Sequence, residues 1–155
     1  MNCLKILKAA DVAEGMELTG PTRLMTRERM RWYVDAQPTV ALDTGRIERQ
    51  EPTIHDDDAY ARSQGLPGII ADGMISTNWI LGLLIERFGE TAACEGRLRT
   101  KYVKPIYEDD AIVARARITA AEPDGDRLRC TLDVWCSNGA DQQVTVGEAT
   151  VFVPR

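Results

Sequence analysis

The strongest constraint on the fold is one run of mostly apolar residues, DGMISTNWILGLLIERF, from Asp72 to Phe88. Asp72 is a good helix N-cap, and Gly89, directly after the run, is a typical helix stop. The run therefore predicts a helix over about residues 72–88. A helix of about 16 residues is short for a membrane span. Because few of its positions are polar, other parts of the protein must enclose it.

The chain after this helix changes to the two-residue period of β-strands. In the segment LRCTLDVWC, from Leu128 to Cys136, apolar side chains alternate with polar ones, and Pro123–Asp126 and Asn138–Gly139 are hairpin signals. This order predicts an α+β fold, with an antiparallel sheet wrapped around the helix. Such a sheet has open edges, which are commonly paired with a second subunit, so we expect a homodimer or higher homo-oligomer. The predicted strands are Cys94–Lys104, Ala111–Ala121, Arg127–Ser137 and Gln143–Val153.

The residues before the central helix predict shorter elements. Met16–Met25 is interpreted as a strand that is interrupted by Gly20 and Pro21, which suit either a bulge or a sheet edge. Thr26 and the following RERMRWYVDA predict a capped helix, and AYARSQ, after three aspartates, predicts a short one that ends at Gly65. Thr39–Thr53 shows no regular period; it is either a binding loop or lid, or a tolerated surface insertion.

Length and charge limit the class of protein. The chain has 155 residues, a net charge of −5 and a pI near 5.0. We expect a single domain over residues 1–155, without the dense basic face that nucleic-acid binding needs. No apolar run is long enough to cross a membrane, and the first residues do not resemble a secretory signal, so we expect a cytoplasmic protein.

The cysteines give no sign of a metal site. Cys3, Cys94, Cys130 and Cys136 include no C-x-x-C pair, and one histidine is present in the whole chain. Tetrahedral metal sites usually draw on closely spaced ligand pairs. We therefore expect four reduced thiols and no metal.

Three residues near the helix start are candidates for chemistry. His55 is the only histidine, and an imidazole is the side chain best suited to proton transfer near neutral pH, although a lone histidine is more often a surface or packing residue. Asp72 is interpreted as a helix cap in preference to a catalytic acid. Gly73 would let a substrate carbonyl reach a first-turn N–H, or would allow close packing of helix and sheet; both interpretations stay open.

Basic residues gather on one predicted strand. Arg97, Arg99 and Lys101 share a face, with Lys104 just beyond. They could meet the phosphates of a cofactor tail, although a solvated strand face is the commoner use of this pattern. The chain has no G-x-G-x-x-G fingerprint, Walker A motif or nucleophile elbow. Nucleotide redox chemistry, P-loop phosphoryl transfer and serine hydrolysis therefore lose their main support.

Two segments resemble a known family. PTIHDDDAYARSQGLPGIIADGMIS, from Pro52 to Ser76, and KPIYEDDAIVARARI, from Lys104 to Ile118, are similar to the MaoC-like dehydratase family, which includes (R)-specific enoyl-CoA hydratases. The family carries a signature close to D-x-N-P-[LIV]-H, then an acidic short helix, then a segment like A-H-G-M. The resemblance covers about two-thirds of the chain and implies a hot-dog fold.

The resemblance also implies a reaction. Members of the family hydrate or dehydrate fatty acyl thioesters, usually on coenzyme A, which is then part of the substrate; no other cofactor is implied. By residue-level match, His55 would be the general acid/base and the Gly73 amide the oxyanion donor, with a weaker match for Ser76 as an assisting hydroxyl. The substrate would be an acyl-CoA or an acyl-carrier thioester.

The chain departs from the signature at its aspartate. Pro52 to His55 is one residue longer than Pro-x-His, Arg49 or Gln50 stands where the aspartate is expected, and Glu51 falls near the asparagine position. Asp72 also replaces the common histidine before Gly73. The Asp–His pair of the family therefore cannot be identified in the motif.

Three explanations of this departure compete. Another carboxylate, with Glu51 leading and Asp43 and Asp35 behind it, could supply the base; His55 could act alone; or catalysis is lost and the domain only binds acyl thioesters. Our main hypothesis is an enoyl-thioester hydratase or dehydratase that uses His55, Glu51 and the Gly73 amide. The alternatives are a non-catalytic acyl-thioester-binding subunit, or a hot-dog thioesterase whose carboxylate is Asp72.

Overall fold

The computed structural model describes residues 6–36 and 52–154. Its central element is the helix α3 (Gly73–Phe88). The Asp72 carboxylate accepts a hydrogen bond of 2.8 Å from the Met74 N–H, and Gly89 ends the helix with a φ of 79°. Both features were predicted from the sequence, and both are confirmed.

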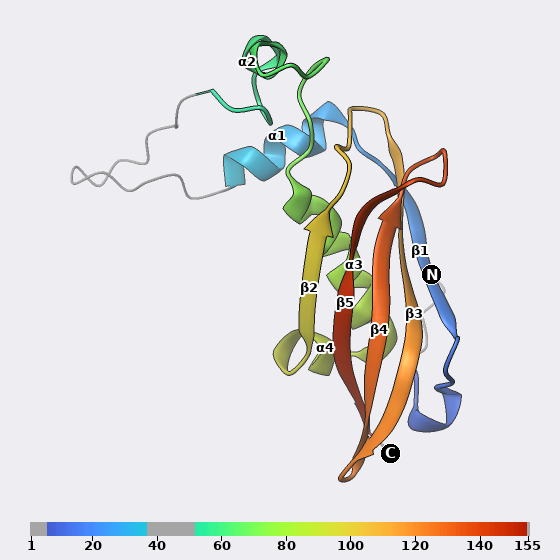
Figure 1. Ribbon diagram of the computed structural model, residues 1–155. Helices are drawn as coiled ribbons and strands as arrows, with labels where there is room; N and C mark the ends of the chain where they lie inside the picture. The colour runs from blue at the N-terminus through green and yellow to red at the C-terminus, as the bar shows by residue number, and fades with distance from the viewer. Residues whose placement is uncertain (1–5, 37–51, 155) are drawn as a thin grey trace, which may run out of the picture.

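A five-stranded antiparallel sheet wraps around α3 (Figure 1). The strand order is β1-β3-β4-β5-β2, so β1 and β2 lie at the two edges. The predicted α+β architecture is therefore confirmed. The strands are β1 (Glu17–Leu24), β2 (Arg97–Tyr102), β3 (Ala111–Asp124), β4 (Arg127–Ser137) and β5 (Gln143–Pro154).

The core lies between the inner face of the sheet and α3. Ile80, Leu83 and Leu84 of α3 have exposed fractions of 0–1%. Alternate residues of β3 and β4, such as Ile118 and Leu132, meet them from the sheet with no exposed surface. This alternation is the one the strand pattern predicted. Burial of these apolar side chains is the main term that stabilises the packing of α3 on the sheet.

The predicted boundaries differ from the structure by one to three residues at several strand ends, and β2 ends at Tyr102 and not at Lys104. Cys94 ends the short helix α4 (Thr91–Cys94) instead of starting a strand, and β2 begins only at Arg97. Gly96 makes the turn: a Cβ there would stand 2.3 Å from the Ala92 carbonyl oxygen. β3 also continues three residues past the predicted end, because it pairs with β4 as far as Asp124.

The remaining elements precede α3 in the sequence. They are η1 (Ala9–Asp11), α1 (Arg27–Ala36) and α2 (Asp58–Ser63), and α1 and α2 lie beyond the N-terminal end of α3 (Figure 1). The bulge predicted in the first strand is present between Thr19 and Thr22. Most of the predicted Thr39–Thr53 loop lies outside the described residues. No helix in residues 6–36 and 52–154 has both the length and the apolarity to cross a bilayer.

Candidate active site at the start of the central helix

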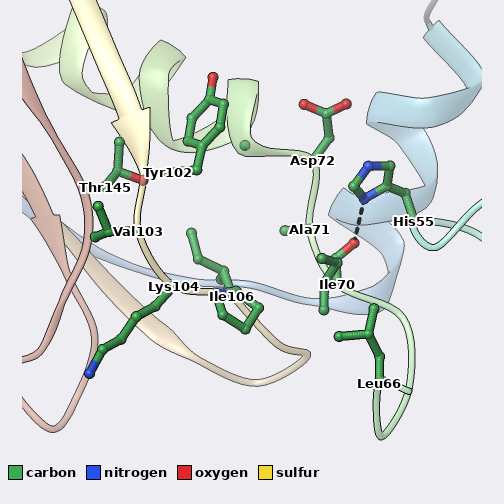
Figure 2. A pocket seen from close by; sticks show the side chains of 12 residues that line it. His55, Leu66, Ile70, Ala71, Asp72, Tyr102, Val103, Lys104, Ile106 and Thr145 are labelled. Atoms are coloured by element: carbon green, nitrogen blue, oxygen red, sulfur yellow. Dashed lines mark hydrogen bonds between the residues drawn. The ribbon is translucent and has the colours of Figure 1, made fainter. Parts of the chain in front are cut away.

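A cavity of about 540 Å³ lies at the N-terminal end of α3. Figure 2 shows His55 and Asp72 on one side of it, and Tyr102 and Thr145 on the other. The chain therefore brings the sole imidazole and the first turn of α3 to one cavity, which a reaction that uses both His55 and the Gly73 amide requires. The lining residues are His55, Leu66, Ile70, Ala71, Asp72, Gly73, Tyr102, Val103, Lys104, Pro105, Ile106 and Thr145.

A hydrogen bond fixes the half-buried ring of His55. Its Nδ1 lies 2.9 Å from the Ile70 carbonyl oxygen (Figure 2). Because a carbonyl oxygen can only accept, Nδ1 must carry the proton. In the neutral imidazole the lone pair is then on Nε2, which is the state a general base needs.

Short polar contacts hold the segment that carries His55. Thr53 donates to the Asp56 carboxylate from its N–H at 2.8 Å and from its hydroxyl at 3.1 Å, and its Oγ1 accepts from the His55 N–H at 3.1 Å. The Ile70 N–H donates to the Ile54 carbonyl at 3.0 Å. Hydrogen bonds therefore hold the backbone on both sides of His55.

Arg27 joins this segment to two neighbouring elements. From α1 it donates to Asp58 at 2.8 Å and to Glu108 at 2.6–2.8 Å. Asp58 begins α2, and Glu108 follows the Val103–Ile106 wall of the cavity. The Arg27 hydrogen bond, followed by one from the Ile69 N–H, holds the pKa of the Asp58 carboxyl below its ordinary value. This contact could not be predicted from the sequence, because Arg27, Asp58 and Glu108 are far apart in the chain.

The first turn of α3 is crowded by an aromatic ring. A Cβ built on Gly73 would stand 2.6 Å from three ring atoms of Tyr102. The packing interpretation of Gly73 is therefore correct, and it is compatible with an oxyanion role for its amide. First-turn amides have no acceptor inside their helix, and no hydrogen bond from the Gly73 N–H occurs in the described part of the chain.

Ser76 lies beneath the cavity instead of lining it. Its hydroxyl has no exposed surface, donates to the Gly73 carbonyl at 2.7 Å and lies 2.7 Å from Thr145 Oγ1. Since the Ser76 proton is used on Gly73, Thr145 must be the donor to Ser76. Thr145, which the sequence analysis did not single out, therefore connects the cavity to the helix start. Cys136 donates to the Ser76 carbonyl nearby, and burial raises the pKa of its thiol to about 12.

Comparison with known proteins decides the family. The family model described as "MaoC like domain" matches residues 52–140, more than half of the chain. The chain belongs to the MaoC-like family. No significant match was found among curated proteins.

Solved structures show the hot-dog fold of this MaoC-like chain. The MaoC-like dehydratase from Rhodospirillum rubrum has 18% identity and a TM-score of 0.75, with 96% of this chain and 97% of that one covered. The (R)-hydratase PhaJ1 from Pseudomonas aeruginosa has 19% identity and a TM-score of 0.72, with coverages of 94% and 84%. The truncated HadBC complex, a (3R)-hydroxyacyl-ACP dehydratase from Mycobacterium tuberculosis, has 17% identity and a TM-score of 0.64, with coverages of 90% and 96%.

Other candidate residues of the MaoC-like chain lie in different places. Glu51 and Asp43 are outside the described residues, and Asp35 is exposed on α1. Asp72 lines the cavity while one of its oxygens caps α3. Lys104 is on the cavity wall, whereas Arg97, Arg99 and Lys101 are exposed along β2.

Proposed function

We propose that this chain hydrates a 2-enoyl thioester to a 3-hydroxyacyl thioester, and catalyses the reverse dehydration. The observation that carries the proposal is the cavity that His55 shares with the first turn of α3. Its other walls are mostly apolar, which suits an acyl chain. The known activities of the similar (R)-hydratase and (3R)-hydroxyacyl-ACP dehydratase add support by analogy.

In the proposed mechanism, the Gly73 N–H binds the thioester oxygen. The helix N-terminus carries partial positive charge, so it stabilises the enolate that forms as water adds to C3. Neutral His55 accepts a water proton on Nε2 while the water oxygen bonds to C3. The imidazolium then returns that proton to C2 on the same face, which completes a syn addition with one imidazole.

A carboxylate would assist by orienting the water. Glu51 is our leading candidate because it lies closest to His55 in the sequence among the carboxylates of the preceding loop. Asp43 and Asp35 are the other candidates from the sequence. Asp72 is a further one from the structure, since it lines the cavity while also capping α3.

We propose an acyl-CoA or an acyl-carrier thioester as the substrate, with no further cofactor and in the cytoplasm. We also propose that two copies of the chain associate as a homodimer. In the described part of the chain, β2 pairs only with β5, so its other side offers unpaired backbone groups to a partner.

A thioesterase is the second candidate function. It is favoured by one observation, the Asp72 carboxylate beside the helix N-terminus in the same cavity. In that reaction a carboxylate-activated water attacks the thioester carbonyl and releases the free thiol. A subunit that only binds thioesters is the third possibility, and it predicts binding without turnover.

Product analysis tests the proposal. The wild type and a His55→Ala variant are incubated with 2-enoyl-CoA thioesters of increasing chain length, and the products are separated by chromatography. We expect a 3-hydroxyacyl-CoA from the wild type and a loss of roughly 10²- to 10⁴-fold in kcat for the variant. Unchanged hydration in His55→Ala would exclude the assigned role. Release of free thiol would favour the thioesterase, and binding alone the non-catalytic subunit.

A further inference from the structure

Tyr102 and Gly73 occupy one space from two elements. Tyr102 is the last residue of β2, and its ring lies where a side chain at position 73 would begin, 2.6 Å from the Cβ position. Both residues line the cavity. Figure 2 shows the Tyr102 ring on the cavity side opposite His55, with Asp72 at the helix start between them. The ring is therefore a wall beside the amide that we assign to the thioester oxygen.

A chain of hydrogen bonds holds this ring in place. The Tyr102 hydroxyl donates to the Met74 sulfur at 3.2 Å. Because a hydroxyl has one proton, the contact of 3.0 Å with Thr77 must be donated by Thr77, and the 2.8 Å contact between Thr77 and Thr100 by Thr100. The Tyr102 hydroxyl is thus bound to two residues of α3, Met74 and Thr77, and Thr77 is bound in turn to Thr100 of β2.

This anchoring decides which part of Tyr102 a ligand meets. The hydroxyl proton is used on Met74, so the ring, and not a proton donor, faces the cavity. The side chain as a whole remains 47% exposed, so it is a boundary between the cavity and solvent and not a core residue. A ring that its hydroxyl binds to α3 limits the width of the cavity next to the Gly73 N–H.

We propose that Tyr102 is a positioning and specificity-determining residue for the acyl thioester. Its fixed ring keeps the Gly73 amide accessible and excludes acyl groups with bulk next to the thioester carbonyl. Gly73 must be glycine because a methyl group there would clash with the ring and force it to move. This inference rests on the proposed function, since the assignment of the amide does.

A double-mutant cycle tests the coupling between the two residues. Gly73→Ala keeps the backbone N–H, but the added methyl group would clash with the Tyr102 ring beside it. If the displaced ring keeps the thioester oxygen from this N–H, kcat/KM for crotonyl-CoA should fall by up to roughly 10²-fold, the size expected when an oxyanion donor no longer acts. Tyr102→Ala makes room for the new methyl group while the amide stays in place. The double variant should therefore recover roughly tenfold over Gly73→Ala, which is the non-additivity expected of residues in contact.

Matched controls separate this effect from damage to the fold. Gly82 lies in the same helix, and a Cβ there would meet nothing within 4 Å, so Gly82→Ala should leave kcat/KM unchanged. Tyr60 is another exposed tyrosine, at 41%, and does not line the cavity, so Tyr60→Ala serves as the control for Tyr102→Ala. Tyr102→Phe keeps the ring and loses the hydrogen bonds of its hydroxyl, so it should lower kcat/KM by roughly fivefold or less.

Acyl selectivity provides the second readout. Crotonyl-CoA is compared with tiglyl-CoA, which carries a methyl group on C2, and the ratio of their kcat/KM values should shift toward tiglyl-CoA by roughly tenfold in Tyr102→Ala. A residue that only stabilises the fold would lower both values together. An unchanged ratio, or a Gly73→Ala loss that persists in the Tyr102→Ala background, would overturn the proposal.

Binding measurements distinguish failure of this inference from failure of the proposed function. If the wild type turns over neither thioester, the same variants are titrated with crotonyl-CoA by calorimetry. Non-additive losses in affinity would then support the inferred contact of Tyr102 and Gly73 with the ligand, and would contradict the proposed hydratase activity. If the wild type turns over the thioesters and the losses in the variants are additive, the hydratase proposal stands and the inferred coupling of Tyr102 and Gly73 is wrong.

Discussion

The two regions that meet at the cavity are stabilised in different ways. The body, formed by α3 and the sheet, buries apolar side chains such as Ile80 and Ile118 completely. The segment from Pro52 to Asp72 contains one helix, α2, of only six residues, and most of its side chains remain partly exposed. Hydrogen bonds from side chains to the backbone hold that segment, including the bond from His55 to Ile70.

This difference separates stability from chemistry. His55 lies on a segment that polar contacts hold, so it can be substituted without removing a side chain from the hydrophobic core. The donor that we assign to the oxyanion belongs to the body instead, where the helix itself fixes the position of the amide. Substitutions in the two regions should therefore affect different measurements.

The largest effect on folding is expected in the body. Leu83→Ala removes a side chain that is 1% exposed, so it should lower the free energy of unfolding by about 2–5 kcal/mol. Leu66→Ala removes the same atoms from the partly exposed segment and should cost clearly less. Urea titrations followed by circular dichroism measure both, and equal losses would contradict the comparison.

Ser76→Ala should have the next largest effect. It leaves the buried Thr145 hydroxyl without its acceptor and removes the side-chain hydrogen bond to the Gly73 carbonyl, which should cost about 1–3 kcal/mol. Removing both hydroxyls in Ser76→Ala/Thr145→Val should cost less than the single change, because no hydroxyl proton is then left unpaired. Denaturant titration of these two variants and of Thr145→Val is the measurement, and simple additivity would argue against the assigned direction of these bonds.

Arg27→Ala should act locally. Its side chain is 42% exposed, so its ion pairs contribute little to global stability, but they connect α1 to the His55 segment. Amide hydrogen exchange over residues 53–70 should rise by roughly fivefold or less, while exchange in β4 stays the same. Arg129, whose pair with Glu122 lies far from the cavity on β4 and β3, provides the matched control, Arg129→Ala. Equal changes in the exchange of residues 53–70 in both variants would contradict a local effect of Arg27.

Acidification should give the smallest effect. Because the pKa of Asp58 is lowered in the folded state, its contribution is present above the ordinary value of 3.8 and is lost as the pH falls through the lower folded pKa. The thermal midpoint of the wild type should therefore fall more steeply than that of Asp58→Asn below about pH 4. Parallel pH profiles would show that the Arg27–Asp58 contact does not stabilise the fold.

The sequence predicted the body well because its signals are local. Asp72 and Gly89 bound α3 through chemistry within one turn, and alternation placed Leu132 and Val134 on the buried face of β4. Cys94 was misplaced in a strand: it ends the four-residue helix α4, which is too short to show a helical period in the sequence.

The site was predicted only in part. His55 and Gly73 could be found because one is the sole imidazole and the other opens an apolar helix. Tyr102 and Arg27 could not, since each acts through residues that only the folded chain brings together. The role of Glu51 stays a prediction.

The position of Tyr102 on an edge strand has a consequence for regulation. Because β2 is paired on one side alone in the described part of the chain, a second chain that docks along its free side would restrain the same strand that ends in Tyr102. Quaternary assembly and acyl selectivity would then share a mechanical element. A change in subunit contacts, distant from any substrate atom, could thereby retune which thioesters are accepted.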